Sequence, residues 1–229
     1  MTKPKLLRIP VSERAGDVSA LWLDPAGADA VLAFAHGAGA DMNHAFMADL
    51  AGRLAARGIA TLRHQFPYSE AGRRGPNPGP VLRATIRAAL AQTGELAEGR
   101  PVFAAGKSMG GRMTSLLAAE EPLPARGIVF FGFPLHAAGK PPSRERGEHL
   151  RDVALPMLFL QGTRDKLADL ALLEPLVASL GPRTRLHRVE GGDHGFHVLK
   201  RSGRSDADVL DELADETRAF LDEIVREDG

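Results

Sequence analysis

The sequence predicts an α/β fold, in which a mostly parallel sheet carries helices on both of its faces. Short apolar runs alternate along the 229-residue chain with longer segments whose apolar residues recur at helical spacing. The runs, of which 30–35 and 101–105 are examples, are apolar at successive positions, as is typical of strands buried on both faces. The length fits one domain over residues 1–229.

The expected elements follow one another in a regular order. Residues 5–11 and 18–23 come first and predict an antiparallel edge hairpin, because the second segment alternates polar and apolar residues. The remaining expected strands are 30–35, 59–62, 101–105, 127–133, 157–161 and 185–189. The expected helices are 46–55, 81–90, 111–120, 170–180 and 206–225. Residues 67–80 are rich in proline and glycine and predict a loop.

Composition excludes several classes of function. Lys plus Arg equals Asp plus Glu, 29 each, so charge gives no reason to expect nucleic acid or an anionic membrane as a partner. The absence of cysteine excludes disulfides, a thiol nucleophile and a cysteine-bound metal. No signal-peptide block opens the chain, and no apolar run approaches the roughly 20 residues that span a bilayer. We therefore expect a cytoplasmic protein without a cofactor or metal.

The most informative motif is Gly106-Lys107-Ser108-Met109-Gly110, which stands between an expected strand and an expected helix. Such a turn is too tight for side chains at both flanking positions, and it makes the serine project from the strand end. Strand, G-x-S-x-G and helix together predict a nucleophile elbow with Ser108 as the nucleophile. A phosphate-binding loop would need a further glycine five positions earlier, where Pro101 offers no amide hydrogen, so that alternative fails.

A serine nucleophile needs a base and an acid, and the sequence offers one of each in the required order. Enzymes with this elbow carry serine, then Asp or Glu, then histidine along the chain. Asp165 follows the expected strand 157–161, and His194 follows the expected strand 185–189. Ligands of parallel sheets bind outside the carboxyl ends of the strands, which is where both residues stand. We predict that His194 is the base and that Asp165 orients it.

Other residues compete for these roles. Asp169 and Asp193 are alternative acids, although Asp169 is better placed to cap the next helix and Asp193 would have to point away from its neighbour's imidazole. His194 and His197 form a weak candidate for a metal pair, because no further ligand stands nearby in the sequence.

The oxyanion of a tetrahedral intermediate needs backbone donors. The amide of Met109 is the first candidate, because it lies at the positive end of the helix that follows Ser108. The loop after residues 30–35 should supply the second donor, and Ala38 is preferred there over Gly37. A tight strand-to-helix turn would use the same glycines without any catalytic role.

At this point the chain resembles a known family. The motifs that carry the resemblance are His36–His44, Ala105–Met113, Phe131–His136, Leu160–Asp165 and Glu190–His194. They resemble α/β-hydrolase-like proteins related to testis-expressed protein 30 and to subunit 3 of the non-specific lethal complex, a group similar to dienelactone hydrolases. The resemblance implies the α/β-hydrolase fold and a triad of Ser108, Asp165 and His194, but no defined substrate. Dienelactone hydrolases proper use a cysteine nucleophile, which Ser108 replaces here.

The loops expected around the site carry an excess of positive charge. Residues 36–45, 63–79, 106–112, 133–152, 162–168 and 191–204 together hold 14 Lys or Arg against 7 Asp or Glu. Such a face would favour anionic substrates, with Lys107 as a substrate-binding residue; solvated loop charges, or a structural ion pair for Lys107, are the alternatives. The segment from His136 to Asp152 is short, so no large cap is expected.

These observations predict a serine hydrolase that acts on a small carboxylic ester or thioester. The alternative from another class is a non-catalytic protein-interaction module of the same fold.

Overall fold

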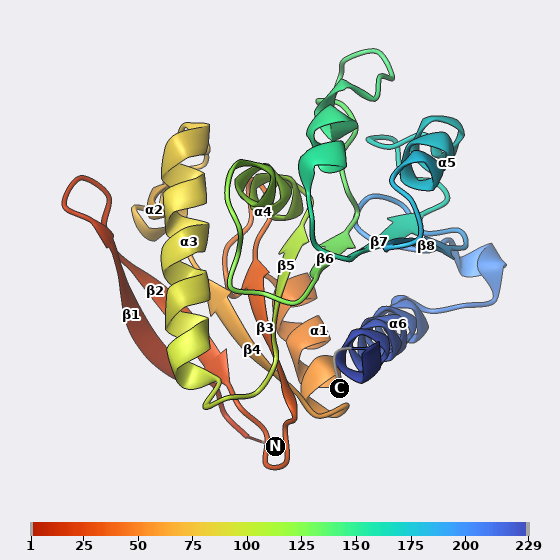
Figure 1. The fold of residues 1–229 in the computed structure, drawn as a ribbon. Coiled ribbons are helices and arrows are strands. Elements are labelled where there is room, and N and C mark those ends of the chain that lie inside the picture. The colour runs from red at the N-terminus through yellow and green to blue at the C-terminus, as the bar shows by residue number, and fades with distance from the viewer. Residues whose placement is uncertain (1, 228–229) are drawn as a thin grey trace.

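The computed structural model describes residues 2–227, whose strands form one sheet in the order β1-β2-β4-β3-β5-β6-β7-β8 (Figure 1). The strands are β1 Lys5–Ser12, β2 Gly16–Leu23, β3 Ala30–Ala35, β4 Ile59–His64, β5 Val102–Lys107, β6 Ile128–Phe131, β7 Met157–Gly162 and β8 Thr184–Val189. β2 pairs antiparallel with both β1 and β4, whereas all the other neighbours are parallel. The predicted edge hairpin and mostly parallel sheet are confirmed.

Helices cover both faces of this sheet (Figure 1). One face carries α1 Ala45–Ala55 and α6 Asp206–Glu227, and the other carries α3 Gly79–Leu96, α4 Met109–Glu120 and α5 Leu170–Ser179. β6 shows how the strands serve both layers. Its Ile128 and Phe130 pack into the core under α3, α4 and α5, while Val129 and Phe131 pack into the core under α1 and α6. Strands buried on both faces therefore read as continuous apolar runs.

Two segments differ from the expected pattern. The proline-rich segment 67–80 contains a short helix, α2 Pro67–Glu70, and α3 already begins at Gly79. Proline is favoured in the first turn of a helix, because its fixed φ suits the helix and its missing N–H would have had no partner there. The second segment is η1, Glu145–Asp152, a 3-10 helix that packs against α4 and forms no large cap.

The parallel strands all point their carboxyl ends at one edge of the sheet, and the loops that leave β3, β5, β7 and β8 meet there. Within residues 2–227, no helix is both long enough and apolar enough to cross a membrane.

Candidate active site

Ser108 occupies a strained turn between β5 and α4. Its backbone has φ 50° and ψ −114°, which is left-handed φ space that a residue with a side chain rarely adopts. Its amide donates to the carbonyl of Phe131 on the neighbouring strand, and its carbonyl accepts from Arg112 one helical turn later. These bonds at both ends of the residue hold the serine in its strained conformation, so that the side chain stands at the strand end.

The glycines of the motif allow strand and helix to approach each other closely. A Cβ added to Gly106 would lie 2.1 Å from the amide nitrogen of Gly111, a distance that no real side chain tolerates. The sharp turn that presents Ser108 therefore depends on glycine at position 106.

His194 and Asp165 form a continuous hydrogen-bonded chain with the serine. Nε2 of His194 lies 2.8 Å from Oγ of Ser108, and Nδ1 of His194 lies 2.7 Å from Oδ2 of Asp165. Asp165 is only 6% exposed, so water competes little for its carboxylate. Because the carboxylate can only accept, Nδ1 carries a proton and Nε2 is left to accept from the serine hydroxyl. This is the tautomer that a histidine base requires.

The two loops that carry Asp165 and His194 are neighbours because β7 and β8 are paired in the sheet. They approach closely at Gly162, where an added Cβ would lie 2.3 Å from the carbonyl oxygen of Gly192. The amide of Arg164 donates to that same carbonyl at 2.9 Å. A side chain at position 162 would thus push apart the loops that carry Asp165 and His194.

Gln161, which was not identified from the sequence, holds the carboxylate of Asp165 in place. This side chain is fully buried at the end of β7, and its Nε2 donates to Oδ2 of Asp165 at 2.6 Å. Its Oε1 accepts from the amide of Phe133 at 2.9 Å. The amide of Leu167 donates to the other carboxylate oxygen of Asp165. The sequence signal that could have identified Gln161 is its position as a lone polar residue at the end of an otherwise apolar strand.

The competing residues have partners of their own. Asp169 caps α5 by accepting from the amide of Ala171 at 2.9 Å. Asp193 accepts from the amides of Gly195 and His197, and so shapes the loop on which His194 stands. Nδ1 of His197 lies 2.7 Å from Asp206, which raises the pKa of His197. Among residues 2–227, no three His, Asp or Glu side chains gather in an arrangement that could hold a metal ion.

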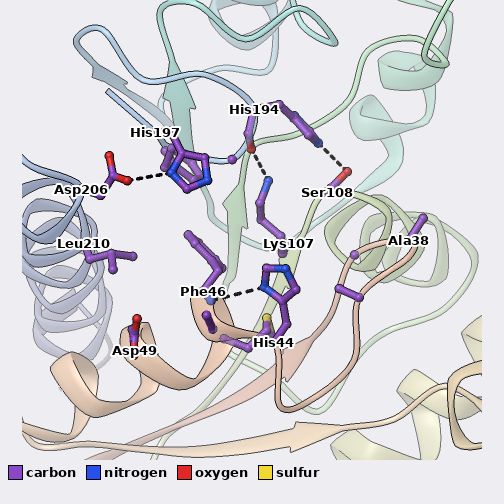
Figure 2. A pocket seen from close by; sticks show the side chains of 16 residues that line it. Ala38, His44, Phe46, Asp49, Lys107, Ser108, His194, His197, Asp206 and Leu210 are labelled. Carbon is purple, nitrogen blue, oxygen red and sulfur yellow. Dashed lines mark hydrogen bonds and ion pairs between the residues drawn. The ribbon is translucent and has the colours of Figure 1, made fainter. Parts of the chain in front are cut away.

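Lys107 points into the site from the end of β5, and its ammonium donates to the backbone carbonyl of His194 (Figure 2). The ammonium also lies 5.2 Å from the ring centroid of Phe196 and 5.7 Å from that of Phe46. Burial lowers the pKa of Lys107 to about 8, although the charges of Asp165 and Asp193 act against this shift. Lys107 lines the cavity described below, so its contact with a substrate stays a prediction.

The loop after β3 lies directly against the serine. A Cβ added to Gly37 would be 3.6 Å from Cβ of Ser108. The carbonyl of Gly37 accepts from the hydroxyl of Tyr68 at 3.3 Å and from the amide of Ala40 at 3.3 Å. In a trans peptide the next N–H points opposite to the carbonyl, so these bonds direct the amide of Ala38 away from Tyr68. Tyr68 lies in the segment expected to be a loop and was not identified from the sequence.

A cavity of about 340 Å³ opens beside Ser108 and His194 (Figure 2). Its wall is largely apolar, with Phe46, Met47, Phe196 and Leu210 among the lining residues. The fixed charges of its lining are Asp49, Lys107 and Asp206. The arginines of segments 63–79 and 133–152 do not line it, so the excess of positive charge counted in the loops is not concentrated in this cavity.

Comparison with known proteins adds a family to this geometry. A family model described as an alpha/beta hydrolase domain matches residues 28–222. This match covers most of the chain, including the elements that carry Ser108, Asp165 and His194.

Several solved structures share the fold. An α/β serine hydrolase without a lid, from Xanthomonas campestris, is 20% identical with a TM-score of 0.75, over 96% of each chain. A dienelactone hydrolase from Anabaena variabilis is 21% identical with a TM-score of 0.73, over 96% of this chain and 98% of the other. The esterase domain of a Rhodothermus marinus protein is 17% identical with a TM-score of 0.71, over 95% of this chain and 97% of the other.

Proposed function

Because the chain belongs to the alpha/beta hydrolase domain family, we propose that it is a serine hydrolase of carboxylic esters or thioesters, with Ser108 as the nucleophile. The observation that carries the proposal is the hydrogen-bonded chain from Ser108 through His194 to the buried carboxylate of Asp165. A hydroxyl with no base beside it is a weak nucleophile at neutral pH, and here the base lies within hydrogen-bonding distance.

The reaction would proceed in two halves. As Oγ of Ser108 attacks the acyl carbon, Nε2 of His194 takes the hydroxyl proton, and Asp165 stabilises the imidazolium that forms. The tetrahedral intermediate then breaks its bond to the leaving oxygen or sulfur, which receives that proton from His194. In the second half, Nε2 of His194 takes a proton from a water molecule whose oxygen attacks the acyl carbon. The bond between Oγ of Ser108 and the acyl carbon then breaks, His194 returns the proton to Oγ, and the acid is released.

Two backbone amides would hold the oxyanion in both halves. Met109 follows the nucleophile at the first position of α4, where the helix dipole favours negative charge. Ala38 lines the cavity, and the bonds to the Gly37 carbonyl orient the peptide that carries its amide. The amide of Gly37 is the second choice on this loop.

The apolar cavity would receive the acyl group. Phe46, Phe196 and Leu210 offer an apolar wall beside the serine, and a cavity of about 340 Å³ suits a small acyl chain better than a long one.

A fluorophosphonate probe tests this proposal, because it labels only an activated serine. The wild-type protein should be labelled and should hydrolyse p-nitrophenyl acetate or a short acyl thioester, and Ser108→Ala should lose both properties. Ser202→Ala, which changes an exposed serine outside the cavity lining, is the control and should behave as wild type. A folded wild-type protein that is neither labelled nor active on such a panel would instead favour a non-catalytic interaction module, the role suggested by the resemblance to a chromatin-complex subunit.

A further inference from the structure

A second hollow, of about 560 Å³, lies over α4 and η1 and is separate from the cavity beside His194. It is lined by the cationic residues Arg112, Lys140 and Arg146, by His136, and by one acidic residue, Glu145. We refer to it as the arginine hollow. Three fixed positive charges against one negative charge leave an excess that fits a doubly charged anion.

Within the described part of the chain, the cations of the arginine hollow form no ion pair with a carboxylate. Within residues 2–227, Arg112 makes no side-chain hydrogen bond, and its Nε is buried without a partner. Arg146 donates to the backbone carbonyl of His136 and, among the described residues, to no carboxylate. On the other side of α4, by contrast, Arg83 and Arg87 of α3 each bind a glutamate. The arginines of α3 are therefore paired with carboxylates, whereas those of the arginine hollow are not.

Packing holds these unpaired charges close together. Burial lowers the pKa of Arg112, and the charge of Arg146 lowers it further, while Glu145 acts in the opposite direction. A guanidinium that is partly desolvated beside another cation is destabilised until an anion binds, and planar guanidinium groups suit phosphate oxygens. His136 binds its own neighbouring carbonyl through Nδ1, which leaves Nε2 as a further polar group of the hollow.

The arginine hollow also lies close to the nucleophile. The amide of Arg112 donates to the carbonyl of Ser108, so the two residues are one helical turn apart, about 6 Å along the axis. The apolar cavity lies beside Ser108 toward α1 and α6, and the arginine hollow lies toward α4 and η1. Ser108 lines the apolar cavity, and Arg112, one helical turn later, lines the arginine hollow. This arrangement matches an ester that has one apolar half and one anionic half.

Building on the serine-hydrolase proposal, we propose that the arginine hollow binds a phosphate group on the leaving half of the substrate. The substrate class is an ester or thioester with an apolar acyl group and a phosphate-bearing alcohol, phenol or thiol. Arg112 and Arg146 would bind the phosphate oxygens, and Lys140 would add charge at the rim.

Two matched esters test this inference. The anionic one is 2-(4-acetoxyphenyl)ethyl phosphate. The neutral one is its dimethyl phosphate ester, which has the same acyl group and the same phenol ring and differs only by the two methyl groups on the phosphate. The wild-type kcat/KM should be at least 10-fold higher for the anionic ester at low ionic strength. The ratio should fall as salt rises, because ions screen the attraction. Inorganic phosphate should inhibit hydrolysis of the anionic ester competitively.

Variants locate the effect. Arg112→Gln and Arg146→Gln should each reduce the ratio of the two kcat/KM values at least 5-fold and weaken inhibition by phosphate. Lys140→Gln should act in the same direction, and because Lys140 is exposed this variant also covers the case in which an arginine variant fails to fold. Arg83→Gln changes a paired arginine outside the arginine hollow and should keep the wild-type ratio.

The outcomes separate the two proposals. Hydrolysis that depends on Ser108 with equal kcat/KM for the two esters would overturn the phosphate site alone. So would a preference for the anionic ester that survives Arg112→Gln, Arg146→Gln and Lys140→Gln. Hydrolysis that persists in Ser108→Ala would instead overturn the serine-hydrolase proposal.

Discussion

Lys107 holds the backbone carbonyl of His194, so the residue before the proposed nucleophile fastens the loop that carries the proposed base. The two residues are 87 positions apart in the chain, and they meet at the carboxyl edge of the sheet. The ammonium lies within 6 Å of the ring centroids of both Phe46 and Phe196, and burial lowers its pKa to about 8. The hydrogen bond from Lys107 therefore tethers the loop of His194, but it requires the ammonium to be removed from water.

The first prediction follows from that cost. Below pH 8 Lys107 is charged in both the folded and the unfolded chain, and its burial penalty is fully present. Between pH 8 and 10.5 only the unfolded chain keeps the proton, so the free energy of unfolding should rise with pH. Lys107→Met should therefore be more stable than wild type below pH 8, by about 1–3 kcal/mol, and the difference should shrink toward pH 10.5.

Urea denaturation at several pH values measures this difference. Lys166→Met removes an exposed lysine nearby and should show no comparable pH-dependent gain. A Lys107→Met variant whose stability relative to wild type does not change between pH 7 and 10 would contradict the argument.

A second prediction concerns which carboxylate orients His194. Asp165→Asn should lower kcat by roughly 10⁴, because the amide favours the wrong imidazole tautomer. Asp193→Asn should lower it far less, since Asp193 binds backbone amides and not the imidazole. Steady-state kinetics on p-nitrophenyl acetate distinguishes the two variants, and a larger loss at Asp193 would transfer the role of the acid.

A third prediction assigns Gln161 a positioning role. Gln161→Met should lower kcat about 10-fold with a smaller change in KM, because Asp165 loses a donor while the substrate loses no contact. Loss of that donor should also raise the pH of the acidic limb of the kcat profile, since hydrogen bonds to a carboxylate favour its charged form. Thr93→Val removes another buried hydrogen bond, remote from Asp165, and should move neither quantity. A pH profile unchanged by Gln161→Met would limit Gln161 to a structural role.

A fourth prediction uses the strain at Ser108. Its φ of 50° costs a residue with a side chain on the order of 1–3 kcal/mol, whereas glycine adopts such a φ readily. Ser108→Gly should therefore be about 1 kcal/mol more stable than Ser108→Ala, while both variants lose activity. Thermal denaturation compares the two, and equal melting temperatures would mean that the turn is not strained.

Much of the fold was predictable because its signals are local. β3 occupies residues 30–35 as expected, since a run of apolar residues between turn signals defines a buried strand. The ends of helices were less predictable. α3 begins at Gly79, within a stretch that proline and glycine mark as a loop, because packing of its apolar face outweighs the weak propensity of its first turn.

The supporting residues of the site were not predictable in the same way. Gln161 and Tyr68 act through contacts with residues that come from other loops, and no spacing rule connects them to Asp165 or Gly37. The position at which the loop charges gather was not predictable from the sequence either. Counted along the chain, the cations surround the predicted site, yet Arg112, Lys140 and Arg146 line a separate hollow, and Lys107 is bound to a carbonyl.

The sequence by itself determined the alternation of strands and helices, the tight turn at Ser108 and the chain order of serine, aspartate and histidine. These depend on neighbouring residues, whose sterics and hydrophobic pattern act over a few positions. Only the tertiary structure decided which carboxylate reaches His194, what Lys107 binds and where the unpaired arginines gather. Those relationships join residues that are far apart in the chain, and their distances are set by strand pairing and by the packing of whole layers.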